Sequence, residues 1–494
     1  MLEDKAISEA PVSSIREEGC SAEWALQMRR NQLVRVFDEM EDPYLRTRKD
    51  DVDHVVNRIQ NILLGRSEIR LLEVDSHIVV ARDLTPADII LLHNQGVRGL
   101  ITEFGSPMSH TAILARSLGI PTIMGVHNVT RHIHDSETLV IDAENGVALV
   151  DCDHQCIRFF QQRLEAEEKH KRSLRALSHT VAETRDGHPL QLLANIELPE
   201  DVQSAAETGA QGIGLYRTEF LYMNRPTLPS EEDHFQAYLQ VVRGIPDAQV
   251  TIRTLDLGAD KQCDQYPQSI PSSNPALGLR AIRLCLKEID IFRIQIRAIL
   301  RVSCFGQVRL MIPMLTNLWE AHHARALIDD EIRNLQRAGV AVDQHIPIGA
   351  MIETPAAAMT ADGFARVFDF LSIGTNDLIQ YTLAVDRADD SVAHLYDPLH
   401  PAILLLIKGI IDATDRSGTP LAMCGEMAGD PSYIPLLIGL GLNELSMHPA
   451  SLLEAKQLIQ QLDYQQLRQQ VHSLMQRPED LGMELRVRQL GRNL

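Results

Sequence analysis

Residues 346–377 read IPIGAMIETPAAAMTADGFARVFDFLSIGTND, and they contain one full unit of the pattern that decides the fold. Two short apolar runs, 346–352 and 368–373, have the composition and length of buried strands. A stretch with helical spacing lies between them. Polar residues follow each run, with Glu353 after the first and Asn376 and Asp377 after the second. The stretch therefore predicts strand, helix, strand, with polar groups at the strand ends.

The same unit repeats from about residue 185 to the end of the chain. The candidate strands cover residues 190–196, 212–216, 250–255, 308–313, 346–352, 368–373, 421–423 and 444–447. Amphipathic helical stretches separate most neighbours. Eight strands that alternate with helices over roughly 300 residues predict a (β/α)8 barrel, in which the active site lies at the carboxyl ends of the strands.

Arginines gather at those predicted strand ends. They are Arg217, Arg253, Arg280 and Arg387. A guanidinium group forms bidentate contacts with phosphate and carboxylate groups. A single arginine is more often part of a surface ion pair, so the prediction depends on their shared placement. Together they predict a small anionic ligand that carries both phosphate and carboxylate.

Two carboxylates and a thiol complete the predicted rim. Glu353 and Asp377 supply hard oxygen ligands of the kind that Mg²⁺ prefers. Cys424 directly follows the seventh strand, and it is the candidate proton donor there. The rim therefore predicts a magnesium site beside a general acid.

A second candidate functional site lies in the segment SPMSHTAILAR, residues 106–116. A turn precedes His110, and a predicted helix runs from it to residue 118. Because a helix N-terminus favours anions, His110 could carry a covalent phosphoryl group; the alternative is an ordinary helix cap. Predicted strands at 78–81, 97–102 and 139–141 place this helix in a small α/β domain. Helical patterns at 21–64 precede that domain, and a charged helix at 153–177 follows it.

Composition limits the classes of partner. The 494 residues predict two to four domains, and 67 acidic against 47 basic residues give a net charge of −20. This charge argues against nucleic acid and anionic membranes as partners. Seven cysteines form no disulfide framework, and Cys152 with Cys156 is interpreted as structural. Together with the lack of a sufficiently apolar span, this predicts a cytoplasmic protein.

Three long strings resemble motifs of one known family. They are GIGLYRTEFL at 212–221, SIGTNDLIQYTLAVDR at 372–387 and MCGEMAGD at 423–430. From about Tyr44 to its end the chain resembles the Enzyme I family of the bacterial phosphotransferase system, the phosphoenolpyruvate–protein phosphotransferases. The resemblance implies that His110 is phosphorylated and that Cys424 protonates the enolpyruvate. It also implies that phosphoenolpyruvate is bound by Arg217, Arg253, Asn376 and Arg387. The implied Mg²⁺ ligands are Glu353 and Asp377.

The resemblance also implies a phosphate acceptor and a domain layout. The acceptor would be a small phosphocarrier protein, HPr or a paralogue, in the first step of sugar uptake, and the barrel would form a homodimer. The layout is a partial helical carrier-binding domain at 1–68, a phosphohistidine domain at 69–152, a connecting helix at 153–180 and a phosphoenolpyruvate-binding barrel at 181–494. Typical domain sizes imply that roughly the first eighty residues of the family's N-terminal region are missing.

One segment departs from the family pattern, and three alternatives remain. Ser106 and Met108 replace a glycine and a threonine that the family usually has before its Ser-His pair. A regulatory, nitrogen-branch-like phosphotransferase protein is one alternative. A pyruvate phosphate dikinase or phosphoenolpyruvate synthase is another, although it would need a nucleotide-binding domain ahead of His110. The third is a homologue without activity, which the complete set of barrel residues argues against.

Overall fold

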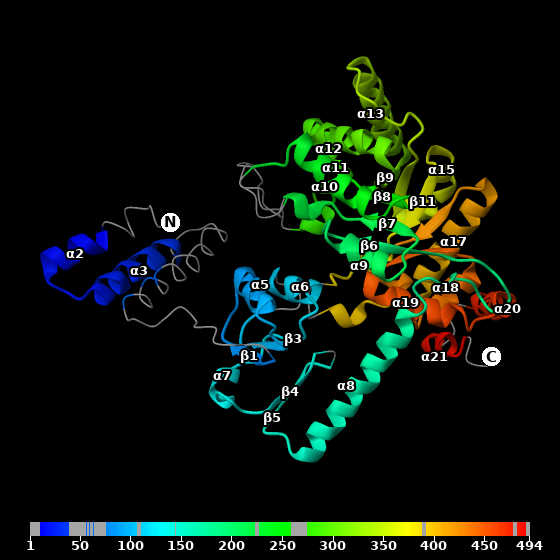
Figure 1. Cartoon of the computed structure of the whole chain (residues 1–494). Coiled ribbons are helices and arrows are strands. Elements are labelled where there is room, and N and C mark those ends of the chain that lie inside the picture. Colours follow the sequence, from blue (N-terminus) through cyan, green and yellow to red (C-terminus); the bar gives the residue numbers. More distant parts are fainter. Residues whose placement is uncertain are drawn as a thin grey trace. The chain divides into compact units, whose positions relative to one another are not determined.

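The computed structural model describes residues 10–38, 56, 59, 63, 76–105, 110–143, 145–222, 227–257, 274–387, 392–477 and 482–490 (Figure 1). The chain divides into two compact units, Met1–Leu164 and Glu165–Leu494. Among the described helices, none combines the length and the hydropathy that crossing a membrane requires. Most of the predicted helical stretch near residue 60 lies outside the described residues. So do Ser106 and Met108, the two residues that depart from the family pattern.

The described part of the first unit starts with helices α2 (Ala10–Glu18) and α3 (Ala22–Asp38). A parallel sheet follows, in the order β1 (Ile78–Ala81), β2 (Gly99–Thr102) and β3 (Thr122–Ile123). Its helices are α5 (Pro86–Asn94), α6 (His110–Ser117) and α7 (Val129–His132), and an antiparallel hairpin of β4 (Leu139–Asp142) and β5 (Val147–Val150) ends the α/β part. The small apolar core contains Leu84, Ile89, Leu92, Leu100, Ala115 and Ile120.

Local sequence explains where these helices begin. Thr85 and Asp88 form a reciprocal capping box, and Pro86 supplies the first helical position of α5, where its missing N–H costs nothing. Helix α6 begins at His110, as the turn signal before it predicts. The sequence pattern did not predict α2, β3 or β5.

The second unit is a closed, all-parallel barrel of eight strands. In chain order they are β6 (Gln191–Ile196), β7 (Gly212–Tyr216), β8 (Gln249–Arg253), β9 (Gln307–Ile312), β10 (Ile348–Ile352), β11 (Phe370–Ile373), β12 (Leu421–Met423) and β13 (Glu444–Met447). Each strand pairs with the next, and β13 pairs with β6 to close the ring. All eight predicted strands are present, with small differences at their ends, so the predicted (β/α)8 fold is confirmed.

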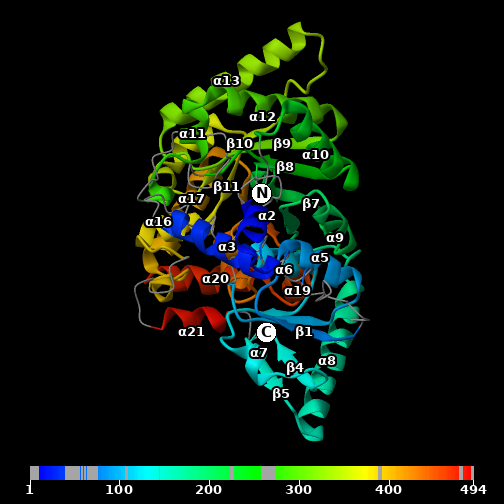
Figure 2. The ribbon, with the colours of Figure 1, turned by 90° about the vertical axis from the view of Figure 1, so that its left-hand side faces the viewer.

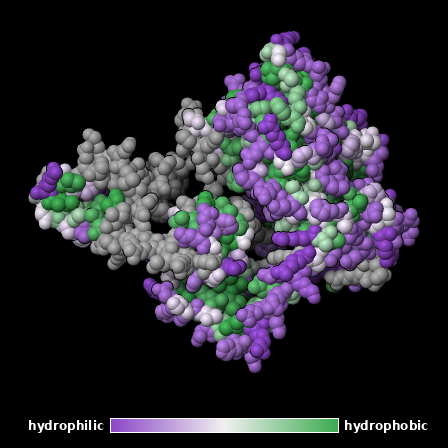
Figure 3. Space-filling model, viewed as in Figure 1, coloured by the Kyte–Doolittle hydropathy of each residue, from purple (hydrophilic) through white to green (hydrophobic). Residues whose placement is uncertain are grey.

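Helices cover the outside of this barrel (Figure 2). Helix α8 (His154–Arg175) crosses the division between the units and corresponds to the helix predicted at 153–177. The α-helices of the barrel unit after α8 are α9 (Asp201–Glu207), α10 (Glu231–Gly244), α11 (Ala281–Lys287), α12 (Ile289–Val302), α13 (Leu318–Arg337), α14 (Pro355–Met359), α15 (Ala361–Val367), α16 (Thr375–Leu383), α17 (Pro401–Ser417), α18 (Ile434–Leu440), α19 (Pro449–Ile459), α20 (Tyr464–Met475) and α21 (Met483–Arg488). The visible outer face of the barrel is mainly hydrophilic, with apolar spots between the polar residues (Figure 3).

Two apolar layers fill the barrel unit. A large cluster lies between the strands and the helices, and a smaller one of Leu215, Met311, Met351, Phe370 and Cys424 fills the inside. Gly349 makes room for the Phe370 ring, because an added Cβ there would lie 2.4 Å from a ring carbon. The barrel is therefore a packed support that presents polar side chains at the strand ends.

Candidate functional site

The predicted barrel residues lie at the carboxyl ends of five strands. Arg217 directly follows β7, and Arg253 is the last residue of β8. Glu353 and Cys424 follow β10 and β12, and the first turn of α16, after β11, contains Asn376 and Asp377. A parallel barrel brings these ends to one rim, so residues far apart in sequence meet there.

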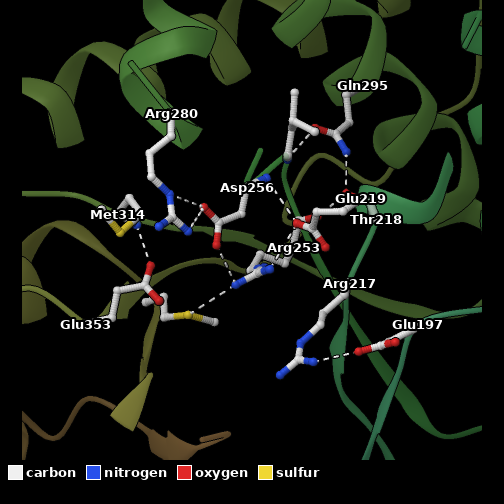
Figure 4. Close-up of polar contacts among 12 residues, drawn as sticks. Glu197, Arg217, Thr218, Glu219, Arg253, Asp256, Arg280, Gln295, Met314 and Glu353 are labelled. Atoms are coloured by element: carbon white, nitrogen blue, oxygen red, sulfur yellow. Dashed lines mark hydrogen bonds and ion pairs between the residues drawn. The ribbon is translucent and has the colours of Figure 1, made fainter. Parts of the chain in front are cut away.

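Arg253 is buried among carboxylates (Figure 4). Its Nη2 lies 2.9 Å from Oε1 of Glu219, and its Nη1 lies 3.0 Å from Oδ2 of Asp256. Burial opposes the positive charge, but the attraction of Glu219, Asp256, Glu353 and Asp377 outweighs it and raises the pKa of Arg253. The guanidinium group is therefore permanently charged and fixed in position before any ligand binds.

Arg280 is attached to the same carboxylate. Its Nη2 lies 2.8 Å from Oδ1 of Asp256, and its Nε donates a second hydrogen bond to that oxygen at 3.2 Å. Its Nη1 donates to the hydroxyl of Tyr381 at 3.1 Å, and Tyr381 in turn donates to the carbonyl of Ala276 at 2.6 Å. Asp256 thus holds two arginines side by side, and α16 contributes to the arrangement through Tyr381.

Buried hydrogen bonds fix the backbone beneath these arginines. Gln295 of α12 is fully buried; its Nε2 donates to the Thr218 hydroxyl at 2.9 Å, and its Oε1 accepts from the N–H of Leu255 at 2.8 Å. Thr218 donates to the carbonyl of Arg253 at 3.0 Å. A helix behind the barrel therefore fixes the ends of both β7 and β8.

Glu353 and Asp377 form a buried pair of carboxylates. They are 1% and 9% exposed, and Oε1 of Glu353 accepts a hydrogen bond from the N–H of Met314 at 2.6 Å. Burial first, and then repulsion from Asp377 and Asp256, raises the pKa of Glu353, while Arg253 opposes the shift. Carboxylate oxygens are hard ligands, and a divalent cation between the two groups would relieve the repulsion that helps to raise the pKa of Glu353, so these residues could hold Mg²⁺.

Asn376 is held by a reciprocal pair of hydrogen bonds with Glu426. Its Nδ2 donates to Oε1 of Glu426 at 3.0 Å, and its Oδ1 accepts from the N–H of Glu426 at 2.9 Å. This pair ties α16 to the segment after β12. The side-chain amide of Asn376 is therefore fixed at the rim.

Cys424 is a buried, neutral thiol. It is 2% exposed, and the Ser372 hydroxyl donates a hydrogen bond to its Sγ at 3.3 Å. Burial raises the pKa of Cys424 to about 11, although the Ser372 hydrogen bond opposes the shift. The thiol consequently keeps its proton at neutral pH, as a proton donor must.

The remaining predicted residues lie in different surroundings. Nη1 of Arg217 is 2.7 Å from Oε1 of Glu197, and the two side chains are 35% and 36% exposed. Arg387 lies after α16 and is exposed; its backbone N–H donates to Oε1 of Gln380 at 3.5 Å. His110 is the first residue of α6 in the other unit. The structure thus brings together Arg253, Arg280, Glu353 and Asp377, with Cys424 nearby, and the charge of Arg217 also acts on the Cys424 thiol.

Sequence reasoning gave no role to several residues that the structure places in this network. Glu219 and Asp256 hold the arginines, and Glu426 and Tyr381 hold Asn376 and Arg280. Glu197 was missed altogether, although it directly follows β6 and so stands where the other strands have their polar residues. Position immediately after a predicted strand is the signal that could have found it.

Comparisons with known proteins agree along the chain. Residues 171–464 match "PEP-utilising enzyme, PEP-binding domain", residues 73–146 match "PEP-utilising enzyme, mobile domain", and residues 1–48 match "PEP-utilising enzyme, N-terminal". PEP here stands for phosphoenolpyruvate. The first match alone covers more than half of the chain.

Several similar proteins carry the name phosphoenolpyruvate-protein phosphotransferase. The protein from Cupriavidus necator is 45% identical over all of this chain and 86% of its own length. The proteins from Staphylococcus carnosus and Bacillus subtilis are 42% and 41% identical over 95% and 94% of this chain, and each is covered to 82%. The chain therefore belongs to the PEP-utilising enzymes and, among them, to the phosphoenolpyruvate-protein phosphotransferases.

Proposed function

We propose that the chain moves the phosphoryl group of phosphoenolpyruvate to its own His110, releases pyruvate, and then passes the group to a histidine of a small phosphocarrier protein. The observation that supports this proposal is that Arg253 and Arg280 both pair with Asp256. The carboxylates of Glu353 and Asp377 act on the same arginines. With a divalent cation on the two carboxylates, such a rim would bind a small anion that carries phosphate and carboxylate groups. The neutral thiol of Cys424 nearby suits a reaction that needs a proton at carbon.

The first half-reaction is an in-line displacement at phosphorus. A ring nitrogen of His110 attacks, and the bond between phosphorus and the enolate oxygen breaks. Arg217, Arg253, Arg280 and Arg387, together with the Asn376 amide, would bind the phosphate and carboxylate oxygens. Because Arg253 and Arg280 are already held by Asp256, little reorganisation is needed when charge shifts to the enolate.

Glu353 and Asp377 would hold Mg²⁺, which supplies positive charge beside the phosphoryl oxygens. Cys424 then gives its proton to the methylene carbon of the enolate, and pyruvate leaves. A pKa of about 11 keeps this donor protonated at neutral pH until the enolate forms. The protein's own residues therefore bind, orient and protonate the three-carbon fragment.

The other parts of the chain would take the remaining steps. We assign residues 69–152 to a mobile phosphohistidine domain, 153–180 to a connecting helix, 181–494 to the phosphoenolpyruvate-binding barrel and 1–68 to carrier docking. We expect a homodimer through the barrel. We place the reaction in the cytoplasm, where reducing conditions keep Cys424 as a free thiol.

The test is transfer to a carrier. Purified chain is incubated with phosphoenolpyruvate, Mg²⁺ and HPr, and pyruvate and phosphorylated carrier are both measured. The proposal predicts equal amounts of the two, and it predicts that pyruvate stops after about one equivalent when the carrier is omitted. Continuous pyruvate release without carrier would indicate a hydrolase and would contradict the proposal.

A further inference from the structure

The surroundings of the Cys424 sulfur contain a hydroxyl with no role so far. Ser372 lies on β11, beside β12, and its Oγ donates to the Cys424 Sγ at 3.3 Å. Both residues are 2% exposed. The register partner of Ser372 on β10 is Met351, which belongs with Cys424 to the apolar cluster inside the barrel. The hydroxyl is thus directed at a sulfur in largely apolar surroundings.

The backbone of Cys424 is fixed separately from its sulfur. Nδ2 of Asn195 on β6 donates to the Cys424 carbonyl at 3.0 Å, and the Cys424 N–H donates to the carbonyl of Ile373 at 3.1 Å. These backbone hydrogen bonds fix the position of Cys424. They do not stabilise the negative charge that forms on its sulfur during the reaction.

Protonation of the enolate leaves a buried thiolate. The Ile373 carbonyl lies 3.7 Å from Sγ and can accept a hydrogen bond from the thiol, but it has no hydrogen to donate to a thiolate. The Ser372 hydroxyl can donate. Among the charged groups that act on the sulfur, Glu353 of the segment after β10 disfavours the thiolate, and Arg253 and Arg217 favour it. A buried anion without a hydrogen-bond donor is energetically costly. A hydrogen bond from the Ser372 hydroxyl would therefore stabilise the thiolate that this step forms.

We propose that Ser372 is a positioning residue for Cys424, holding Sγ in place and donating a hydrogen bond to the thiolate formed in turnover. This inference rests on the proposed function. In the step, the S–H bond breaks, a C–H bond forms at the methylene carbon of the enolate, and the electron pair of S–H stays on sulfur. The thiolate then takes a proton from solvent before the next cycle.

Steady-state kinetics of Ser372→Ala test the proposal. We expect kcat for pyruvate formation to fall about tenfold, because a hydrogen bond to a charged group is lost. The KM for phosphoenolpyruvate should stay within about twofold, and the solvent deuterium isotope effect on kcat should increase as protonation becomes slower. Unchanged kcat, or a fall in kcat without a larger isotope effect, would overturn the proposal.

A pair of variants of equal size separates the hydroxyl from packing. Ser372→Thr keeps the hydroxyl and Ser372→Val lacks it, so turnover should be largely retained in the first and reduced in the second. Ser303→Ala is the control. Ser303 is also buried, and its hydroxyl bonds to Leu300 and Asp343 just before β9 begins, at the other end of the strands. It should behave as wild type. Equal losses in the threonine and valine variants would show that Ser372 acts through packing.

Alkylation of Cys424 gives a readout that does not depend on catalysis. Iodoacetamide reacts with the thiolate, so at a fixed alkaline pH the Ser372→Val protein should react about tenfold more slowly at Cys424 than the Ser372→Thr protein. Peptide mass spectrometry resolves the site. Equal rates, or faster reaction of the valine protein, would refute the role of the hydroxyl even if phosphoryl transfer were intact, and slower reaction of the valine protein would support it whatever the wild-type activity.

Discussion

At the scale of single residues, Asp256 connects two arginines through one carboxylate. Its Oδ2 lies 3.0 Å from Arg253 and its Oδ1 lies 2.8 Å from Arg280, and its side chain is only 4% exposed. We predict that Asp256→Glu lowers kcat/KM for phosphoenolpyruvate by roughly 10- to 100-fold. The charge is kept, but the longer side chain displaces both guanidinium groups, and misplacement of about 1 Å is costly.

A surface pair offers the matched control for that variant. Asp362 and Arg416 form an ion pair at 2.8 Å, with side chains that are 52% and 60% exposed. Asp362→Glu should leave kcat/KM unchanged, since exposed ion pairs contribute little. Steady-state assays of both variants check the prediction. An unchanged kcat/KM in Asp256→Glu would mean that the arginines do not depend on Asp256 for their position.

The pKa of Cys424 makes a second prediction at this scale. Burial raises it to about 11, so the acid form persists as the pH rises through the usual range of a cysteine. The rate of pyruvate formation should therefore show no decline from thiol titration between pH 8 and 9. Cys424→Ser should bind phosphoenolpyruvate with similar affinity and turn over slowly. A decline near pH 8.5 that is absent from the serine variant would contradict the raised pKa of Cys424, and normal turnover in the serine variant would remove Cys424 from the acid role.

The sequence predicts which residue types surround the site. It does not predict which of these side chains contact one another. Arg253, Glu353 and Cys424 were found because each stands at the end of a recognisable strand. The hydrogen bond between Ser372 and Cys424 joins residues 52 positions apart, and the pair of Arg253 and Glu219 joins residues 34 positions apart. Such pairs depend on the register between strands, and no single strand contains that information.

At the scale of elements, α19 anchors the turn that follows α8. Lys456 of α19 is 2% exposed, and its Nζ donates to the carbonyls of Leu177, Ser178 and Thr180 at 3.2, 3.1 and 3.1 Å. Lys456→Met should lower the free energy of unfolding of the second unit by about 1–3 kcal/mol, because three part-buried carbonyls lose a hydrogen bond from a charged donor. Denaturant unfolding measures this change.

The control at this scale is another helix lysine. Lys408 pairs with Asp412 one turn later on α17, and these side chains are 37% and 44% exposed. Lys408→Met should change the free energy of unfolding by less than about 0.5 kcal/mol. If the two methionine variants behaved alike, the carbonyls after α8 would not need the ammonium group of Lys456.

Helices and strands with a clear hydrophobic pattern could be predicted from the sequence. Those with a short or mixed pattern could not. The barrel strands are apolar runs bounded by turns or polar residues, so their positions could be read directly from the sequence. Strand β3 has only two residues, Thr122 and Ile123, which is too few for any alternation to show. Helix α2 lacks an acidic residue in its first turn, and its composition is mixed, so nothing in the sequence indicates its start.

At the scale of the whole molecule, the chain contains two compact units with separate apolar cores. His110 lies in the first unit, and the barrel residues lie in the second. We predict that His110→Ala abolishes phosphoryl transfer and leaves the thermal unfolding of the second unit within about 1 °C of wild type. Calorimetry is the check. A large shift in the barrel transition would contradict the separation of the two roles.

The central claim is that His110 accepts the phosphoryl group of phosphoenolpyruvate. Its most direct test is the intact mass of the wild-type chain and of His110→Ala after incubation with phosphoenolpyruvate and Mg²⁺. The account predicts an acid-labile gain of one phosphoryl group in the wild type and no gain in the variant. A gain of equal size in both proteins, or no gain in the wild type while phosphoenolpyruvate still binds, would contradict it.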